Sequence, residues 1–440
     1  MTPEIGAAHV AEPALDHKDP GADRRFSTDG KAASSRAAIW IPLAGALVPM
    51  LCLSIPIYVI RPFRPQDPTQ LAMALTVRSL APWLSALSAI VVLLVAKRAW
   101  SGIVSRGSRI ALPALSLLAV AGAVLTHVNI FEIMFHPYDA PVFGTIASVQ
   151  TDDDEKVLSV KIGPEVHAYP IRTMGYHHIV NDIIGGVPIA ATYCTLCHTG
   201  LVWSRIVDGR TLHFRLAGIN NGNALMRDEE TSSIWQQSTG QAIFGPLKGR
   251  QLGLIHSDEL TFALWRKEQP QGQVLKPDVP YESKYDDKDW EKEVEKTRTV
   301  VDTRQSGIAP HELMLGISVG EYSKAYPVKA ILAAKIIQDQ VAGVPILLLV
   351  GPDQTSIRVF QIGRVDPSMT FLRVPSADQN GSDAAIQAMI QDTETESHWN
   401  FQGCAISGKL AGQCLKPLDA NKDYWFDWMN HHPASTVFHG

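Results

Sequence analysis

The chain has 440 residues, enough for two or three domains, with 39 lysines and arginines against 44 aspartates and glutamates. A formal net charge of −5 argues against the basic surface that nucleic-acid binding requires, so we expect no nucleic-acid partner.

Residues 1–36 are rich in Ala, Asp, Pro and Ser and show no helical or strand period, which predicts a disordered tail. A membrane domain is predicted over residues 37–135. It contains three apolar runs of the kind that cross a bilayer as helices, at about 39–60, 80–96 and 110–128.

The placement of positive charge orients these runs. Lysines and arginines precede the first run and fill the loop between the second and third, whereas the first loop has fewer and includes Asp67. Because positive loops stay in the cytoplasm, the tail and the second loop are predicted to be cytoplasmic. The sequence therefore predicts a multi-pass protein of the cell (inner) membrane whose C-terminal region is extracytoplasmic, or periplasmic.

From residue 139 onward, short β-branched runs alternate with Gly, Pro, Asn and Asp, which predicts a β-dominated α+β region. The expected strands include 157–162, 166–170, 189–193, 200–206 and 211–216. Residues 177–184 fit either a strand or a short helix.

An internal repeat divides this region. Ala168-Tyr-Pro-Ile and Gly186-Val-Pro-Ile recur 157 residues later as Ala325-Tyr-Pro-Val and Gly343-Val-Pro-Ile. A motif from Asp228 to Trp235 likewise recurs from Asp392 to Trp399. We expect two related halves, at 139–275 and 307–440, joined by a charged linker at 276–306.

One cysteine-rich stretch occurs only in the first half. Cys194, Cys197 and His198 form a Cys-x-x-Cys-His motif, and His177 precedes them. The corresponding positions of the second half, 157 residues later, are Gly351, Gln354, Thr355 and Ala334. The joint loss of these residues indicates a functional site in the first half and a degenerate second half.

Several motifs resemble the DUF3179 family of uncharacterised proteins. They are Ala168-Tyr-Pro-Ile-Arg, Tyr176-His-His-Ile-Val-Asn-Asp182, Gly186-Val-Pro, Thr192-Tyr-Cys-Thr-Leu-Cys197, Leu225-Met-Arg-Asp and the closing Asp423-Tyr-Trp-Phe-Asp-Trp with His432-Pro. The resemblance covers residues from about 139 to the C-terminus and implies no established activity. His198 departs from the family pattern, which weakens haem attachment as a general property of the family, and Thr195 is a second departure from that pattern.

A metal site is the favoured interpretation of the motif. Two thiolates at Cys-x-x-Cys spacing reach one ion, and His177 supplies a third ligand if residues 176–184 and 187–193 form an antiparallel hairpin. The fourth ligand is expected to be His178, His198, Met226 or solvent. Zinc, copper and iron all accept such donors.

Three other functions stay open. Cys194, Cys197 and His198 match the attachment pattern of a c-type haem in an electron-transfer protein. The two cysteines also fit a thiol–disulfide redox protein. Finally, the protein fits a non-catalytic, membrane-bound structural or interaction module that binds a membrane-protein or redox partner. No residue is assigned a catalytic role.

Cys404 and Cys414 flank a predicted hairpin tip at the positions that Gln241 and Gln251 hold in the first half. Outside the cytoplasm, cross-strand pairing predicts a structural disulfide between them.

Overall fold

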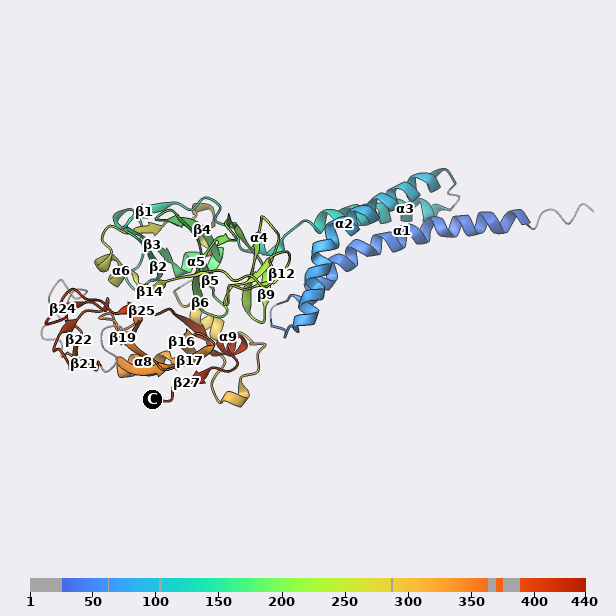
Figure 1. Cartoon of the computed structure of the whole chain (residues 1–440). Coiled ribbons are helices and arrows are strands. Elements are labelled where there is room, and N and C mark those ends of the chain that lie inside the picture. The colour runs from blue at the N-terminus through green and yellow to red at the C-terminus, as the bar shows by residue number, and fades with distance from the viewer. Residues whose placement is uncertain (1–25, 62, 103–104, 286–287, 363–368, 375–387) are drawn as a thin grey trace, which may run out of the picture. The chain divides into compact units, whose positions relative to one another are not determined.

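A computed structural model describes residues 26–61, 63–102, 105–285, 288–362, 369–374 and 388–440. Three apolar helices come first and a β-rich region with several sheets follows, as the sequence predicts (Figure 1). The chain divides into two compact units, one of residues 1–56 and 76–128, the other of residues 57–75 and 129–440. Residues 1–25 of the predicted tail lie outside the described residues, and residues 26–36 form the start of the first helix.

The three long helices are α1 (Phe26–Val59), α2 (Pro68–Ala99) and α3 (Arg106–Leu125). Each is long and apolar enough to cross a membrane. The second helix begins well before the predicted residue 80. Asp67 explains this start, because its carboxylate accepts the backbone N–H groups of Thr69 and Gln70 and Pro68 occupies the first turn.

Small residues bring these helices together. A Cβ atom added at Gly45 would lie 2.5 Å from Val92 Cγ2, and one added at Gly122 would lie 2.7 Å from Pro49 Cβ. Close approach at small residues is how helices pack without a hydrophobic driving force between them. The hydroxyl of Ser88 donates to the carbonyl of Gly45 at 2.6 Å and adds a polar contact.

The first group of sheets contains the strands from residue 143 to residue 275. One sheet has the order β1 (Phe143–Thr145), β15 (Gln273–Leu275), β3 (Glu165–Pro170), β2 (Lys156–Ile162), β14 (Ser257–Thr261). A second has the order β13 (Leu254–Ile255), β6 (Thr199–Ser204), β5 (Val187–Cys194), β4 (Ile179–Ile184). A third has the order β12 (Ala242–Phe244), β11 (Ile234–Gln236), β10 (Asn223–Asp228), β9 (Phe214–Asn220), and β7 (Ile206–Val207) pairs with β8 (Arg210–Thr211).

The second group contains the strands after residue 312. One sheet has the order β26 (Ala420–Tyr424), β16 (Leu313–Val319), β17 (Tyr322–Pro327), β27 (Thr436–Val437). A second has the order β18 (Ile336–Val341), β19 (Val344–Val350), β20 (Ile357–Gln361), β25 (Lys416–Pro417). A third has the order β21 (Phe371–Arg373), β22 (Ile390–Asp392), β23 (His398–Trp399), β24 (Ala405–Ser407).

Short helices accompany both groups. They are α4 (Ile130–Met134), α5 (Ile171–His177), α6 (Phe262–Glu268), α7 (Trp290–Glu295), α8 (Val328–Ala334) and α9 (Trp425–His431). Single 3-10 turns lie at Trp100–Gly102, Ile146–Ser148, Val279–Lys284 and Arg304–Ser306. The elements β16, β17, α8 and β18 each begin 157 residues after β2, β3, α5 and β4.

A C-terminal element packs on the first group of sheets. Strand β26 lies against β6, and the backbone N–H of Tyr424 donates to the carbonyl of Cys197 at 2.9 Å. This bond brings the start of α9 to the turn that holds the Cys-x-x-Cys motif.

The structure confirms the predicted disulfide between Cys404 and Cys414. The two residues face each other in an isolated antiparallel bridge, as Gln241 and Gln251 do in the first group of sheets.

Candidate metal centre

The Cys-x-x-Cys motif forms a tight turn between two paired strands. Strand β5 ends at Cys194, β6 begins at Thr199, and these two residues are register partners. The turn therefore places Cys194 and Cys197 close together. Both are free thiols, and they are 4% and 0% exposed.

Two carboxylates approach this turn from the C-terminal segment. Asp423 lies near the end of β26, and Asp427 lies in the first turn of α9. The Sγ atom of Cys197 and one carboxylate oxygen from each aspartate all lie within 4.8 Å of one another. Asp423 and Asp427 are 2% and 0% exposed, so this cluster is fully interior.

Buried amides and hydroxyls surround the cluster. The amide nitrogen of Asn223 lies 3.1 Å from Cys197 Sγ and 3.1 Å from Asp427 Oδ2, and it also reaches Gln237. Thr199 donates its hydroxyl to Asp423 Oδ1 at 2.9 Å. Neutral donors thus hold the acidic groups in place.

Burial changes the acidity of the cluster. It raises the pKa of Cys197 well above its usual range, and the neighbouring Cys194 and Asp427 raise it further. Burial also raises the pKa of Asp423, and the carboxylate of Asp427 adds to that shift. Both shifts have the same physical cause: burial removes the hydration of the charged form, and acidic neighbours repel its negative charge.

One carboxylate oxygen of the cluster has no hydrogen-bond partner among the described residues. It is Asp427 Oδ1, which is buried. His431 Nε2 lies 3.5 Å from it without forming a hydrogen bond, and the amide of Asn430 lies 3.3 Å from that same nitrogen. The contact with Asp427 is an ion pair only in the protonated form of His431.

The structure contains the predicted hairpin between β4 and β5, but His177 lies before its first strand. His177 ends α5, and His178 after it adopts φ +60°, which turns the chain into β4. His177 Nδ1 lies 2.6 Å from the carbonyl of His136, so this nitrogen is the donor. Its Nε2, 3.0 Å from the hydroxyl of Tyr285, then accepts from that hydroxyl.

The other ligands considered from the sequence have their own surroundings. His198 bonds Tyr193 through Nδ1 at 3.2 Å and Glu291 through Nε2 at 2.8 Å. His178 packs on Phe135, and burial lowers its pKa to about 4. Met226 is fully buried in the same apolar cluster as the two cysteines.

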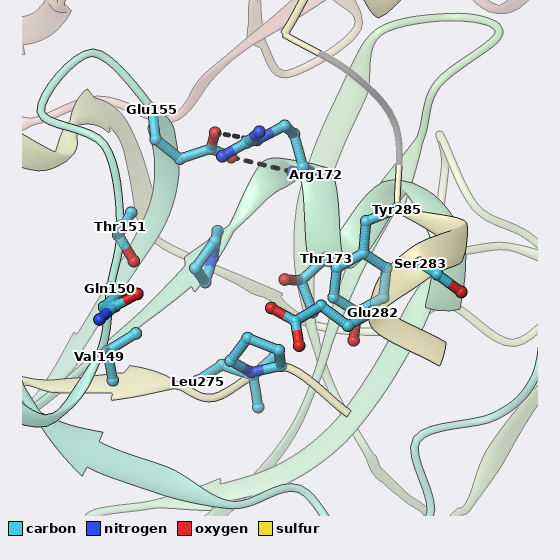
Figure 2. A pocket seen from close by; sticks show the side chains of 12 residues that line it. Val149, Gln150, Thr151, Glu155, Arg172, Thr173, Leu275, Glu282, Ser283 and Tyr285 are labelled. Carbon is cyan, nitrogen blue, oxygen red and sulfur yellow. Dashed lines mark hydrogen bonds and ion pairs between the residues drawn. The ribbon is translucent and has the colours of Figure 1, made fainter. Parts of the chain in front are cut away.

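Tyr285 is also one of the residues that line a polar cavity of about 360 Å³ (Figure 2). An ion pair between Glu155 and Arg172 lines it, and Arg172 also bonds Asp152. Since this arginine is already paired with two carboxylates, the described residues of the lining offer no free cation for an anionic ligand. The cavity also has neither cysteine in its lining.

Asp423 and Asp427 were not among the residues expected to form a site. Their signal was present in the closing Asp423-Tyr-Trp-Phe-Asp-Trp motif, where two acids four residues apart interrupt an aromatic run. The fold brings this segment to the Cys-x-x-Cys turn, although more than half of the sequence of the β-rich region lies between them.

A family model described as "Protein of unknown function (DUF3179)" matches residues 133–435. No curated protein and no solved structure matches the chain. The matched residues contain both the Cys-x-x-Cys turn and the two aspartates, and they cover more than half of the sequence. The chain belongs to the DUF3179 family.

Proposed function

We propose that the β-rich region is a metal-binding domain whose ion is held by Cys197, Asp423 and Asp427, with Cys194 as the fourth ligand. The observation that carries this proposal is the convergence of three buried acidic side chains within 4.8 Å. The Oδ1 atom of Asp427, which is buried and has no hydrogen bond among the described residues, is a second indication of a missing partner.

The physical argument is one of charge. An ionised group buried without a partner costs several kcal/mol, so a thiol and two carboxyls in one interior site must be protonated or neutralised by a cation. Two sulfurs and two carboxylate oxygens form a donor set that suits a tetrahedral divalent ion, and zinc is the simplest candidate. When bound, the ion would supply the positive charge that the described residues lack.

Cys194 suits the fourth position because the turn fixes it beside Cys197. Its Sγ lies 3.6 Å from the carbonyl of Gly222, and this is a weak interaction that an ion would replace. In this proposal the aspartates take the place expected for His177, whose two nitrogens bond His136 and Tyr285.

The contacts of His198 and Cys197 favour a metal ion over the two redox alternatives. A c-type haem needs a free nitrogen of His198, but both are bonded to Tyr193 and Glu291. A thiol–disulfide protein needs an accessible cysteine with a low pKa, whereas Cys197 is buried and its pKa is raised. A closed site with four protein ligands also suits stable ion binding better than hydrolysis.

We also infer that the two groups of sheets are related copies, which gives the site an internal comparison. By the element order, Leu260 and Leu264 correspond to Asp423 and Asp427, and Gly351 corresponds to Cys194. At the two positions that correspond to the aspartates, Leu260 and Leu264 belong to one buried apolar cluster with Phe401. Phe401 and the carboxylate of Asp353, which accepts the hydroxyls of Thr261 and Ser356, lie against Gly351. The related copy therefore packs with leucines at these two positions, so folding alone does not require aspartates at positions 423 and 427.

Metal analysis of the purified full-length protein tests the proposal. We expect about one equivalent of zinc or another transition metal, and less than a tenth of that in Cys197→Ser, because loss of one of four ligands leaves the site open. The matched control is the double variant Cys404→Ser/Cys414→Ser, which removes two cysteines elsewhere and should retain the metal. A metal-free wild type, or equal content in Cys197→Ser, would contradict the proposal.

The domain is proposed to be extracytoplasmic, anchored by three membrane-spanning helices in the inner membrane. The disulfide between Cys404 and Cys414 supports an oxidising compartment, and the charged loops support the same orientation. A membrane or redox partner protein remains compatible with this placement.

Cysteine labelling of intact cells checks the orientation. A cysteine introduced at exposed Lys409 should react with a membrane-impermeant maleimide, whereas one introduced at exposed Ser101, in the loop after α2, should react only after lysis. The reverse pattern would place the β-rich region in the cytoplasm.

A further inference from the structure

The polar cavity lined by Tyr285 extends from the surface into the interior of the β-rich unit. Its lining includes the exposed residues Gln150 and Glu282 and the buried residues Thr173 and Leu275. Its volume of about 360 Å³ lies within the usual range of small-molecule pockets, roughly 300–1,000 Å³. The cavity is therefore accessible from solvent and large enough for a small ligand.

Hydrogen-bonding side chains in this lining are without a partner. Thr173 lies in α5 and is only 4% exposed, and its hydroxyl makes no hydrogen bond to any described residue. The Thr151 hydroxyl and the Gln150 amide likewise have no hydrogen-bond partner in the part of the chain that the structure describes. Figure 2 shows Gln150 and Thr151 on one side of the cavity, facing Thr173 and Glu282 on the other. These groups are available to a ligand.

The charged side chains leave the lining with little net charge. Both carboxylate oxygens of Glu155 accept hydrogen bonds from Arg172, and Arg172 also reaches Asp152. Glu282 lines the cavity without an ion-pair partner among the described residues, but it is exposed, so solvent screens its charge. Neutral groups that both donate and accept therefore provide most of the free hydrogen bonds in the cavity.

One wall of the cavity is fixed by the hydroxyl of Tyr285. This hydroxyl accepts the backbone N–H of Asp278 at 2.7 Å and donates to His177 Nε2 at 3.0 Å. The two bonds hold the 3-10 turn Val279–Lys284, which carries Glu282, against the end of α5. A wall that is already in place lowers the cost of ordering a bound ligand.

The second group of sheets separates the scaffold of the cavity from its polar lining. The ion pair of the cavity recurs there 157 residues later, between Glu312 and Lys329 at 3.2 Å. Thr173, by contrast, corresponds to Ala330, because α8 begins 157 residues after α5. The ion pair thus belongs to the fold of both groups, whereas packing of this short helix does not require the hydroxyl of Thr173.

We propose that this cavity binds a neutral, polyhydroxylated small molecule of monosaccharide size. Each hydroxyl of such a molecule both donates and accepts hydrogen bonds, as the free side chains of Gln150, Thr151 and Thr173 do. Its C–H faces suit the apolar surfaces of Pro170 and Leu275 in the lining. No ligand of the proposed metal centre lines the cavity, so this second site is independent of the proposed function.

Saturation-transfer NMR titrations of the full-length protein, in a detergent without a sugar headgroup, test this proposal. The probes are glucose, galactose, mannose and N-acetylglucosamine, each titrated separately. We expect saturable binding of at least one of them to wild type. Thr173→Ala should bind it about fivefold more weakly, because one net hydrogen bond is lost. Alanine already occupies the corresponding position of α8, so we expect this variant to fold.

A second variant and a matched control locate the binding site. Thr151→Val keeps the shape of the side chain and removes its hydroxyl, and it should weaken binding by a similar factor. Thr436→Ala alters an exposed threonine of β27 that lies outside the lining, and it should bind as wild type does. If Thr173→Ala and Thr151→Val both bind the sugar as tightly as wild type, the cavity is not its site and the proposal is overturned.

Two further titrations test the class of ligand, with putrescine as a cationic probe and inorganic phosphate as an anionic probe. Saturable binding of either one without any of the sugars would overturn the proposed ligand class. Saturable binding of none of the probes would overturn it equally. Metal content measured on the same samples should not differ between these variants and wild type. Its absence from wild type would contradict the metal centre alone.

Discussion

Replacing Asp427 by asparagine is expected to remove the bound metal and to lower the free energy of unfolding by about 4 kcal/mol. This is the stabilisation that a ligand gives at about a thousand times its dissociation constant. Asparagine has nearly the same shape as aspartate, so packing in α9 is retained. The measurement is chemical unfolding of the full chain in detergent, with metal content determined on the same samples.

The sign of this effect separates a metal centre from a cluster of protonated acids. Without an ion, Asp427→Asn removes a group whose carboxylate raises the pKa of Asp423, so the variant would be as stable as wild type or more stable. Wild-type protein stripped with a chelator provides the matched control, since it lacks the metal but keeps the carboxylate. If Asp427→Asn is more stable than wild type in the presence of metal, the proposed metal centre is contradicted.

The pH dependence should also differ between the two forms. In the stripped protein the pKa of folded Asp423 is raised above its ordinary value of 3.8. That group therefore contributes stability fully below about pH 3.8 and loses it as pH rises through the folded pKa. In the loaded protein the trend reverses, because the ligands must deprotonate to bind. The gap between the two unfolding free energies should widen toward neutral pH.

Much of this architecture is local enough to be predicted from the sequence. Apolar runs define the three helices, and short β-branched runs bounded by turn residues define strands such as β2 and β3, whose residues are buried in continuous runs. The disulfide followed from hairpin spacing, since Cys404 and Cys414 are cross-strand neighbours. These features depend on residues close together in the chain.

The metal centre depends on residues that are far apart in the chain. The Cys-x-x-Cys turn is predictable, but its approach to Asp423 is set by the pairing of β26 with β16 and its packing on β6. His177 illustrates the same limit. The antiparallel hairpin of β4 and β5 was predicted, yet the chain turns at the positive φ of His178, and the preceding residue bonds His136 and Tyr285. A single backbone angle of this kind is not encoded in a strand pattern.

A second buried charge network links the two groups of sheets without any ligand. Arg358 in β20 is 9% exposed and bonds both oxygens of Glu268 in α6, at 2.9 and 2.7 Å. It also reaches Asp258 in β14 at 2.9 Å and lies over the ring of Phe401. The Glu268 side chain is fully buried, so its charge depends on this arginine.

Replacing Arg358 by methionine should therefore lower the free energy of unfolding by about 3–5 kcal/mol, the usual cost of leaving a buried charge without its partner. Methionine fills similar volume, so the loss reports charge more than packing. The double variant Arg358→Met/Glu268→Leu should recover most of the stability, because a buried ion pair replaced by apolar residues is often neutral. Arg304→Met is the matched control: its pair with Asp302 is exposed, and its loss should cost at most about 1 kcal/mol. If Arg358→Met and Arg304→Met unfold at the same denaturant concentration, Arg358 does not stabilise the junction between the two groups of sheets.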